Sequence, residues 1–169
     1  MSSNIKLREL VSHDKFVIST LLNNKKIWDN LRDYIPFPYA VEDADEFIEF
    51  TKTKKPIQNF GIDYNGEICG VISIIVQEDI YQKTAEIGYW IGEEYWGNGI
   101  GTESIKLITE YGFQKLNIER IHAGIFAYNK ASMTILEKNG YKKEGVFKKA
   151  IFKNGLFFDE HRYAIIKSK

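Results

Sequence analysis

The stretch EIGYWIGEEYWGNGIGTESI, residues 86–105, runs from a predicted strand into a predicted helix, with glycines at alternate positions between the two. Gly97, Gly99 and Gly101 let the backbone bend sharply and let a bulky anion approach the N–H groups. The first turn of a helix has N–H groups without partners inside the helix, and the helix dipole favours negative charge there. The spacing therefore predicts either a phosphate cradle at a helix start or a tight connection without a ligand.

Two common nucleotide motifs do not fit this loop. A Walker A sequence needs Gly-Lys-Ser/Thr, which does not follow here. A dinucleotide fingerprint needs G-x-G-x-x-G in an early βαβ unit, whereas this loop has G-x-G-x-G after several predicted antiparallel strands.

The composition is typical of a globular protein. The chain has 169 residues, 44% of them hydrophobic and 14% aromatic, which predicts a single domain over residues 1–169 with a sizeable core. Its 23 basic and 23 acidic residues cancel, so charge gives no reason to expect a nucleic-acid or membrane partner. Cys69, alone in an apolar run, is expected to be a buried hydrophobe. Three features together predict a cytoplasmic protein. The chain has one cysteine, its first ten residues contain no apolar segment of signal-peptide length, and no apolar run is long enough to span a membrane.

Hydrophobic periodicity and turn residues predict a mixed α/β fold. Residues 4–10 alternate as a short first strand, and Ser12 is expected to cap the first helix. Asn65-Gly66 and Asn154-Gly155 predict two tight hairpins. The remaining predicted elements are helices around Ile27–Leu31 and from Glu42, a strand at 84–92, a helix with Gly101, Ile105, Ile108 and Gly112 on one face, a strand at 118–126 and a helix ending at Asn139-Gly140.

A second motif lies in IHAGIFAYNKASMTILEKNGY, residues 121–141. Asn129 stands where a strand ends and a helix starts, which is typical of an N-cap. Ser132 follows one turn later and could be an ordinary polar helix residue.

In this order, and with the closing DEHRYAII at 159–166, these segments resemble the GNAT superfamily of acyl-CoA N-acyltransferases. They resemble its RimJ/RimL-type branch most, over about residues 4–166. The resemblance implies a mostly antiparallel central sheet, splayed after the fourth strand and flanked by helices. It also implies that acetyl-CoA is the acyl-donor cosubstrate, and it gives no reason to expect a metal.

The resemblance assigns several residues to acetyl-CoA. Backbone groups near Ile91 and the side chain of Asn129 are expected to contact the pantetheine arm, and Lys138 to lie either near the cofactor or in solvent. The pyrophosphate is expected to contact the loop residues Gly97, Asn98, Gly99, Ile100, Gly101 and Thr102.

The sequence departs from the wider superfamily at two places. Tyr95-Trp96 precedes the loop where many members have Gln-Arg or Arg-Arg. Leu136 stands where many members have a tyrosine that protonates the leaving thiolate, so Ser132, or alternatively Tyr128, is expected to take that role.

An amine must lose its proton before it attacks a thioester, so the site needs a base and a dry pocket. Glu86 is the expected base, acting through water, although it could equally be a solvent-facing strand residue. Glu93 and Glu94 are weaker candidates. Negative charge developing on the carbonyl oxygen needs a donor, and a backbone N–H near Ile91–Gly92 is the expected one.

The segment after the first strand is expected to form one wall of the acceptor site. Its acidic and aromatic residues suit a cationic amine or are a solvated helix face beside core aromatics: Asp29, Asp33, Glu42, Asp43, Asp45, Glu46, Trp28, Tyr34, Phe37 and Tyr39. The sequence thus predicts direct acetyl transfer to a protein N-terminus or a small amine, by a monomer or homodimer. The alternative is a non-catalytic acetyl-CoA-binding or sensor module.

Overall fold

The computed structural model describes residues 4–168. In chain order the strands and helices are β1 (Ile5–Arg8), α1 (Lys15–Leu22), α2 (Lys25–Trp28), α3 (Val41–Lys52), β2 (Asn59–Tyr64), β3 (Glu67–Val76), β4 (Thr84–Ile91), α4 (Ile100–Lys115), β5 (Arg120–Phe126), α5 (Lys130–Lys138), β6 (Lys142–Lys153) and β7 (Leu156–Ile166). Within this range, none of the helices has the length and apolar character that a membrane span requires.

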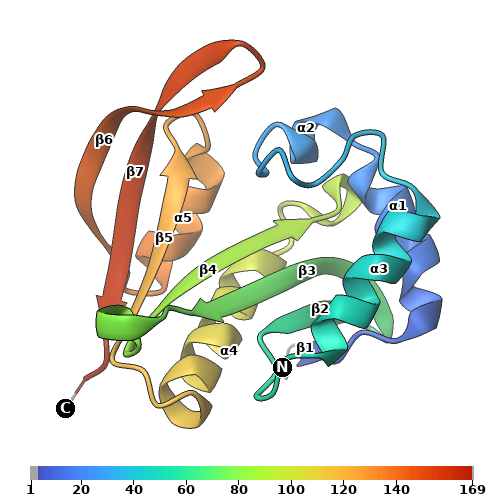
Figure 1. Ribbon diagram of the computed structural model, residues 1–169, viewed down its shortest axis with the longest axis horizontal. Coiled ribbons are helices and arrows are strands. Elements are labelled where there is room, and N and C mark those ends of the chain that lie inside the picture. The colour runs from blue at the N-terminus through green and yellow to red at the C-terminus, as the bar shows by residue number, and fades with distance from the viewer. Residues whose placement is uncertain (1–3, 169) are drawn as a thin grey trace.

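The strands form one seven-stranded sheet in the order β1-β2-β3-β4-β5-β7-β6. Every neighbouring pair is antiparallel except β4 and β5, which run parallel and pair only where Thr84–Glu86 meets Arg120–His122. Beyond that point β4 stays beside β3 while β5 stays beside β7, so the two halves of the sheet diverge (Figure 1). The mixed α/β fold and the opening after the fourth strand are confirmed.

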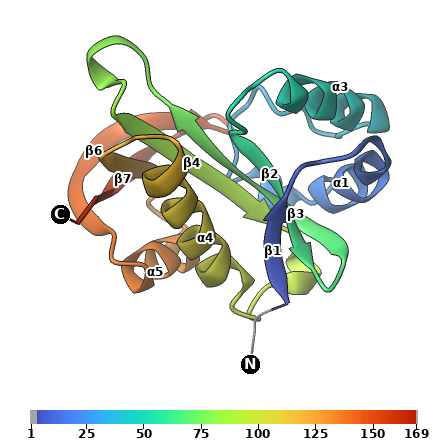
Figure 2. The ribbon, with the colours of Figure 1, turned by 90° about the horizontal axis from the view of Figure 1, so that it is seen from below.

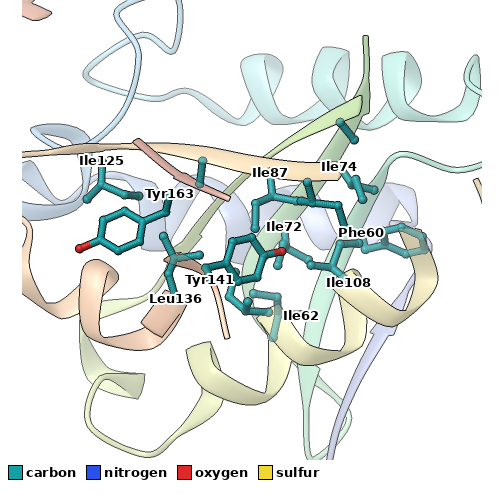
Figure 3. Packing of buried hydrophobic residues seen from close by; sticks show 14 of the residues in the cluster. Phe60, Ile62, Ile72, Ile74, Ile87, Ile108, Ile125, Leu136, Tyr141 and Tyr163 are labelled. Carbon is teal, nitrogen blue, oxygen red and sulfur yellow. The ribbon is translucent and has the colours of Figure 1, made fainter. Parts of the chain in front are cut away.

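Helices cover both faces of the sheet. Figure 2 shows α4 and α5 on one face and α1 and α3 on the other. The core beneath α4 and α5 is rich in isoleucine and includes Leu136, Tyr141 and Tyr163 (Figure 3). The core beneath α1 and α3 includes Ile18, Ile48 and Trp90.

Alternation along β4 decides which of its side chains lie on which face. Ala85, Ile87 and Ile91 pack in the core beneath α4 and α5, with Tyr89 against it, whereas Trp90 packs beneath α1 and α3. Since successive strand residues point to opposite faces, Glu86 and Gly88 share the face of Trp90.

The two predicted hairpin turns are confirmed by their backbone conformations. Asn65 and Gly66 have φ values of 57° and 95°, and Asn154 and Gly155 have 53° and 75°. Positive φ at both central residues matches the right-handed twist of the flanking strands, which explains the Asn-Gly sequences.

The start of the first helix differs from the prediction. Ser12 lies inside a 3₁₀ turn, Ser12–Asp14, and caps nothing. Asp14 stands at the N-cap position of α1 but makes no side-chain cap bond there. Its buried carboxylate closes the 3₁₀ turn instead: Oδ2 accepts from the backbone N–H of Val11 at 2.8 Å and from Nη1 of Arg8 of β1 at 2.8 Å. The second helix is also shorter than predicted, since α2 ends at Trp28 and Leu31 lies in the following loop.

The hairpin of β6 and β7 reaches over to the loop after α2. Lys153, with a side chain only 2% exposed, donates from Nζ to the carbonyl of Leu31 at 3.0 Å and to Oδ1 of Asp33 at 2.6 Å. Its ammonium also lies 3.3 Å from the ring centroid of Trp28. Asn154 adds a hydrogen bond from Nδ2 to Oδ1 of Asp29 at 2.9 Å. The two halves of the sheet are therefore joined above the opening.

Candidate active site

The opening between β4 and β5 exposes backbone hydrogen-bonding groups. Gly92 N–H donates to the carbonyl of Cys69 on the β3 side at 2.8 Å, and groups of alternate residues point to opposite sides of a strand. The N–H groups of Tyr89 and Ile91 therefore point away from β3 and, past the last residues that pair with β5, into the opening. The carbonyl of Ile91 accepts from Nε1 of Trp96 at 2.8 Å. Of the two expected donors, Ile91 N–H faces the opening and Gly92 N–H does not.

The glycine loop ends in the first turn of α4, with Gly99 as N-cap. Gly97 and Gly99 have φ values of 79° and 76°, a left-handed conformation that disfavours other residues. A Cβ at either position would meet no atom within 4 Å, so the space beside the loop is open. Among residues 4–168, no acceptor takes the backbone N–H groups of residues 97–102, and the first helical bond runs from Glu103 N–H to Gly99 O at 3.1 Å. This cradle of free N–H groups fits a pyrophosphate.

The other loop residues have distinct surroundings. Gly101 is buried, and a Cβ there would lie 2.8 Å from Cδ1 of Ile135, so this glycine allows α4 to approach α5. Asn98 turns its side chain back on the loop and donates to the carbonyls of Tyr95 at 3.2 Å and Trp96 at 3.3 Å.

The C-terminal end of α5 lies beside the start of α4. Asn139 donates from Nδ2 to the carbonyl of Thr102 at 3.0 Å. Lys138, in the last turn of α5, is exposed and makes no ion pair with any residue that the structure describes. An exposed Lys138 at this end of α5 is compatible with both expectations, a place near the cofactor and a solvated lysine.

Asn129 is the N-cap of α5, as its sequence position predicts. Its Oδ1 accepts from the backbone N–H of Ser132 at 3.2 Å. Its Nδ2 donates to no acceptor within residues 4–168, which leaves the amide able to bind a second group.

A hydrogen-bonded pair of hydroxyls was missed in the sequence. Ser132 is 6% exposed, and its Oγ lies 2.8 Å from the Oη of Tyr89. Burial raises the pKa of Tyr89 to about 12, so its phenol stays protonated at neutral pH. Tyr89 is on β4 and Ser132 on α5, so the pair joins the two halves of the sheet on the α5 face.

Leu136, which stands at the position of the missing tyrosine, and Tyr128, the alternative proton donor, both make structural contacts. Leu136 is fully buried in the core, as Figure 3 shows. The hydroxyl of Tyr128 already donates to the carbonyl of Asp29. Of the two residues considered in place of the missing tyrosine, only Ser132 is hydrogen-bonded to a second hydroxyl, that of Tyr89, among the described residues.

Glu86 lies on the opposite face, in a polar pocket of about 400 Å³. Its Oε1 accepts from Nη2 of Arg32 at 2.6 Å, and its register partner on β5 is His122. Arg162 of β7 donates from Nη2 to Oε1 of Glu160 at 2.6 Å, and its Nη1 lies 3.5 Å from Nδ1 of His122. All five side chains line this pocket. Of these, the sequence analysis assigns a role only to Glu86, although His122, Glu160 and Arg162 lie inside the quoted motifs.

The environment of His122 keeps its ring neutral. Burial lowers the pKa of His122, and Arg162 and Arg120 lower it further against the opposing effect of Glu86. The pocket therefore holds two carboxylates, two guanidinium groups and one uncharged imidazole at neutral pH.

The weaker carboxylate candidate Glu93 holds α2 in place. Its Oε1 pairs with Lys26 and its Oε2 accepts from Nδ2 of Asn24 at 2.6 Å; the bond from Lys26 lowers the pKa of Glu93. Glu94 is exposed and does not line the pocket.

The expected acidic wall contributes little to the pocket. Asp33 binds Lys153, Asp45 binds Lys15 at 2.9 Å, and Asp43 accepts from the N–H of Ala40 at 2.7 Å. The residue that this segment contributes to the pocket is the cationic Arg32.

Cys69 is an inert core residue, as expected. It is fully buried, its Sγ donates to the carbonyl of Ile62 at 3.4 Å, and burial raises its pKa to about 11. Within residues 4–168, no group of His, Cys, Asp or Glu side chains has the arrangement of a metal site.

The chain is similar to bacterial acetyltransferases over nearly its whole length. It is 31% identical to the N-acetyltransferase YoaA of Bacillus subtilis (strain 168) over 165 residues, which are 95% of this chain and 92% of that protein. The crystal structure of the microcin C7 self immunity acetyltransferase MccE with acetyl-CoA and AMP has a TM-score of 0.83 at 30% identity, covering 99% and 94% of the two chains. The ribosomal L7/L12 alpha-N-protein acetyltransferase RimL, in complex with coenzyme A, has a TM-score of 0.86 at 25% identity, covering 98% and 95%.

The family model described as the acetyltransferase (GNAT) domain matches residues 4–142. That range includes the glycine loop, the opening between β4 and β5, and the whole of α5. The chain belongs to the GNAT acetyltransferase family and is an acetyl-CoA-dependent N-acetyltransferase.

Proposed function

We propose that this enzyme transfers the acetyl group of acetyl-CoA directly to a primary amine, as a member of the RimJ/RimL-type branch. The acceptor is a protein N-terminal α-amine or a small amine. The observation that carries the proposal is the opening between β4 and β5, which has free N–H groups and hydroxyls on one face and Glu86 on the other. Residues 1–169 act as one domain, in the cytoplasm, as a monomer or homodimer.

The α4 and α5 face holds acetyl-CoA, which supplies an activated acetyl thioester. The backbone N–H groups of Gly97, Asn98, Gly99, Ile100, Gly101 and Thr102 bind its pyrophosphate. Asn129 donates from Nδ2 to the pantetheine arm, the N–H of Ile91 faces the same opening, and Lys138 adds positive charge at the end of α5. Support comes from the unpaired N–H groups and the open space at Gly97 and Gly99.

Two protons must move during the reaction, one from the amine and one to the departing thiolate. Glu86 accepts the first, directly or through water, from the charged face of the sheet. Ser132 donates the second from its Oγ and takes a proton from Tyr89 through their hydrogen bond, and Tyr89 regains one from water. Because a thiol is a fair leaving group, the help from Ser132 is modest.

Membership of this enzyme family favours catalysis over the alternative of a non-catalytic acetyl-CoA-binding module. The test is amine-dependent release of free CoA thiol from acetyl-CoA, across a panel of small amines and N-terminal peptides. At least one amine is expected to raise CoA release well above the rate of hydrolysis. Tight acetyl-CoA binding without stimulation by any amine contradicts the proposal and favours the sensor module.

A further inference from the structure

The pocket around Glu86 is electrically balanced. It contains Glu86 and Glu160 as anions and Arg32 and Arg162 as cations, with the neutral His122 between the two ion pairs. The side chains of Arg162 and Glu160 are 27% and 20% exposed, so both charges are largely withdrawn from water. A ligand that brings net charge into this site leaves a charge without a partner, which is costly in such surroundings.

Both signs of charge keep unused hydrogen-bonding capacity. Within the described residues, Glu86 and Glu160 each use Oε1 only, which leaves both Oε2 atoms as acceptors. Arg32 donates only from Nη2, and Nη1 of Arg162 has only the ring nitrogen of His122, 3.5 Å away. The pocket can therefore bind an ammonium group and an anionic group of the same molecule.

Two glycines follow the lining residues of β4 and β5 on the strands that border the gap in the sheet. Gly88 follows Glu86 on the same face of β4, and a Cβ at Gly88 would meet nothing within 4 Å. On the other side of the gap, a Cβ at Gly124 of β5 would lie 2.6 Å from the carboxyl group of Glu160, so this glycine makes room for that carboxylate. The absence of a side chain at Gly88 thus leaves space beside Glu86 on this face of β4.

We infer that the acceptor is a small zwitterionic amine, a primary amine that carries its own carboxylate or other anionic group, with the anion bound by Arg162 and Arg32. The inference rests on the proposed function and narrows its acceptor. The volume of about 400 Å³ suits a small molecule.

Other acceptor classes fit this charge arrangement less well. A polyamine brings several positive charges to a pocket that already contains two guanidinium groups. A peptide N-terminus, with its carboxyl group converted to an amide, offers these guanidinium groups no anion at the corresponding position.

The experiment compares free α-amino acids with their own carboxamides, together with spermidine and an N-terminal peptide. Release of CoA thiol gives kcat/KM for each acceptor. At least one amino acid is expected to exceed its carboxamide by about tenfold or more, a preference typical of a charge-assisted contact. Titration of the same compounds into CoA-saturated protein by calorimetry measures binding without turnover.

Two variants identify the groups responsible. Arg162→Gln and Arg32→Gln are each expected to raise KM for the amino acid and to leave KM for its carboxamide unchanged or lower. Two variants are used because Arg162 also contacts Glu160 and its removal could disturb folding, whereas Arg32 is largely exposed. Arg120→Gln is the matched control, because Arg120 pairs with Glu144 outside the pocket. It is expected to leave the preference intact.

Equal use of acids and amides, or a best acceptor that is spermidine or the peptide, overturns the inference. If no amine releases CoA but amino acids still bind more tightly than amides through Arg162, the proposed function fails and the acceptor assignment fails with it, although the pocket binds a zwitterion. If an amine is acetylated but neither turnover nor binding distinguishes amino acids from their carboxamides, the proposed function stands and the inference fails.

Discussion

The two faces of the opening between β4 and β5 are made of different chemistry. On the α4 and α5 face, the polar groups are mostly uncharged: backbone N–H groups, the amide of Asn129 and the paired hydroxyls of Tyr89 and Ser132, with Lys138 as a charged group at the end of α5. On the other face, the polar groups are charged side chains, and two of them, Glu160 and Arg162, lie beyond the residues that the family model matches.

This difference suggests that one face serves the cofactor, which the family shares, and that the other serves the acceptor, which differs between members. Backbone N–H groups in a fixed loop bind a phosphate whatever the neighbouring side chains are, so they suit a cofactor common to all members. Charged side chains from several elements can change one at a time, so they suit an acceptor that differs between members. Variants on one face should therefore alter cofactor use or proton transfer, and variants on the other should alter acceptor choice.

The largest effect is expected from the hydroxyl pair. Ser132→Ala should lower turnover about tenfold to a hundredfold, the lower part of the range for general acids, with little change in acetyl-CoA affinity. Tyr89→Phe should lower turnover as well, and the double variant should be no slower than Ser132→Ala, because the two hydroxyls act together. Steady-state kinetics at saturating acetyl-CoA provide the measurement. Turnover of Ser132→Ala within about twofold of the parent contradicts the role.

The next effect tests the loop. Gly99→Val should weaken acetyl-CoA binding by about tenfold or more, because a β-branched residue at φ 76° strains the cradle and intrudes on the pyrophosphate. Calorimetry measures the affinity. Gly155→Val is the matched control: it places the same residue at φ 75° in the turn between β6 and β7, so it should reduce stability without changing the affinity. If folded Gly99→Val binds acetyl-CoA with unchanged affinity, the loop does not bind the pyrophosphate as proposed.

A smaller effect is expected at Asn129. Asn129→Ala should reduce the free energy of unfolding by about 1 kcal/mol through loss of the cap, and raise KM for acetyl-CoA by about two- to tenfold through loss of one hydrogen bond. Asn24→Ala removes another asparagine N-cap, that of α2, and should reduce stability while leaving KM for acetyl-CoA unchanged. Equal behaviour of the two variants indicates that Asn129 is a cap only.

The smallest effect concerns pH. Because the pKa of His122 is lower in the folded protein than in the unfolded chain, the unfolded chain binds more protons below about pH 6.5, and His122 reduces stability as pH falls. His122→Asn should therefore flatten the loss of stability between about pH 7.5 and pH 5.5, measured by urea unfolding. Tyr89→Phe should leave that slope unchanged, because the pKa of Tyr89 is about 12. If stability falls more steeply with decreasing pH in His122→Asn than in the parent, the direction assigned to the pKa shift of His122 is wrong.

Local features of the sequence predicted the parts of the fold that depend on neighbouring residues. The Asn-Gly turns, the glycine loop and the Asn129 cap each need a backbone conformation that a few adjacent residues determine. The predicted cap at Ser12 was wrong because a 3₁₀ turn precedes α1, and Asp14 closes that turn together with Arg8, which comes from a strand and not from the turn itself.

The missed site residues depend on contacts between distant segments. Tyr89 has an assigned role only because its strand places the phenol against Ser132, 43 positions later. Arg32, His122 and Arg162 come together only because β7 inserts between β5 and β6 and because the loop after α2 lies across the opening. Spacing along the sequence contains no signal for such a group.

The position of β7 between β5 and β6 has a consequence for the order in which a newly made chain acquires its two binding faces. The glycine loop, Asn129 and Ser132 are all synthesised before β6. The charged pocket needs Glu160 and Arg162, and its closure needs the contact of Lys153 with Asp33, 120 positions earlier. Contacts at such separation form slowly, and chains grow from the N-terminus at roughly 5–20 residues per second. A nascent chain thus contains every residue of the cofactor face before it contains the last residues of the acceptor face.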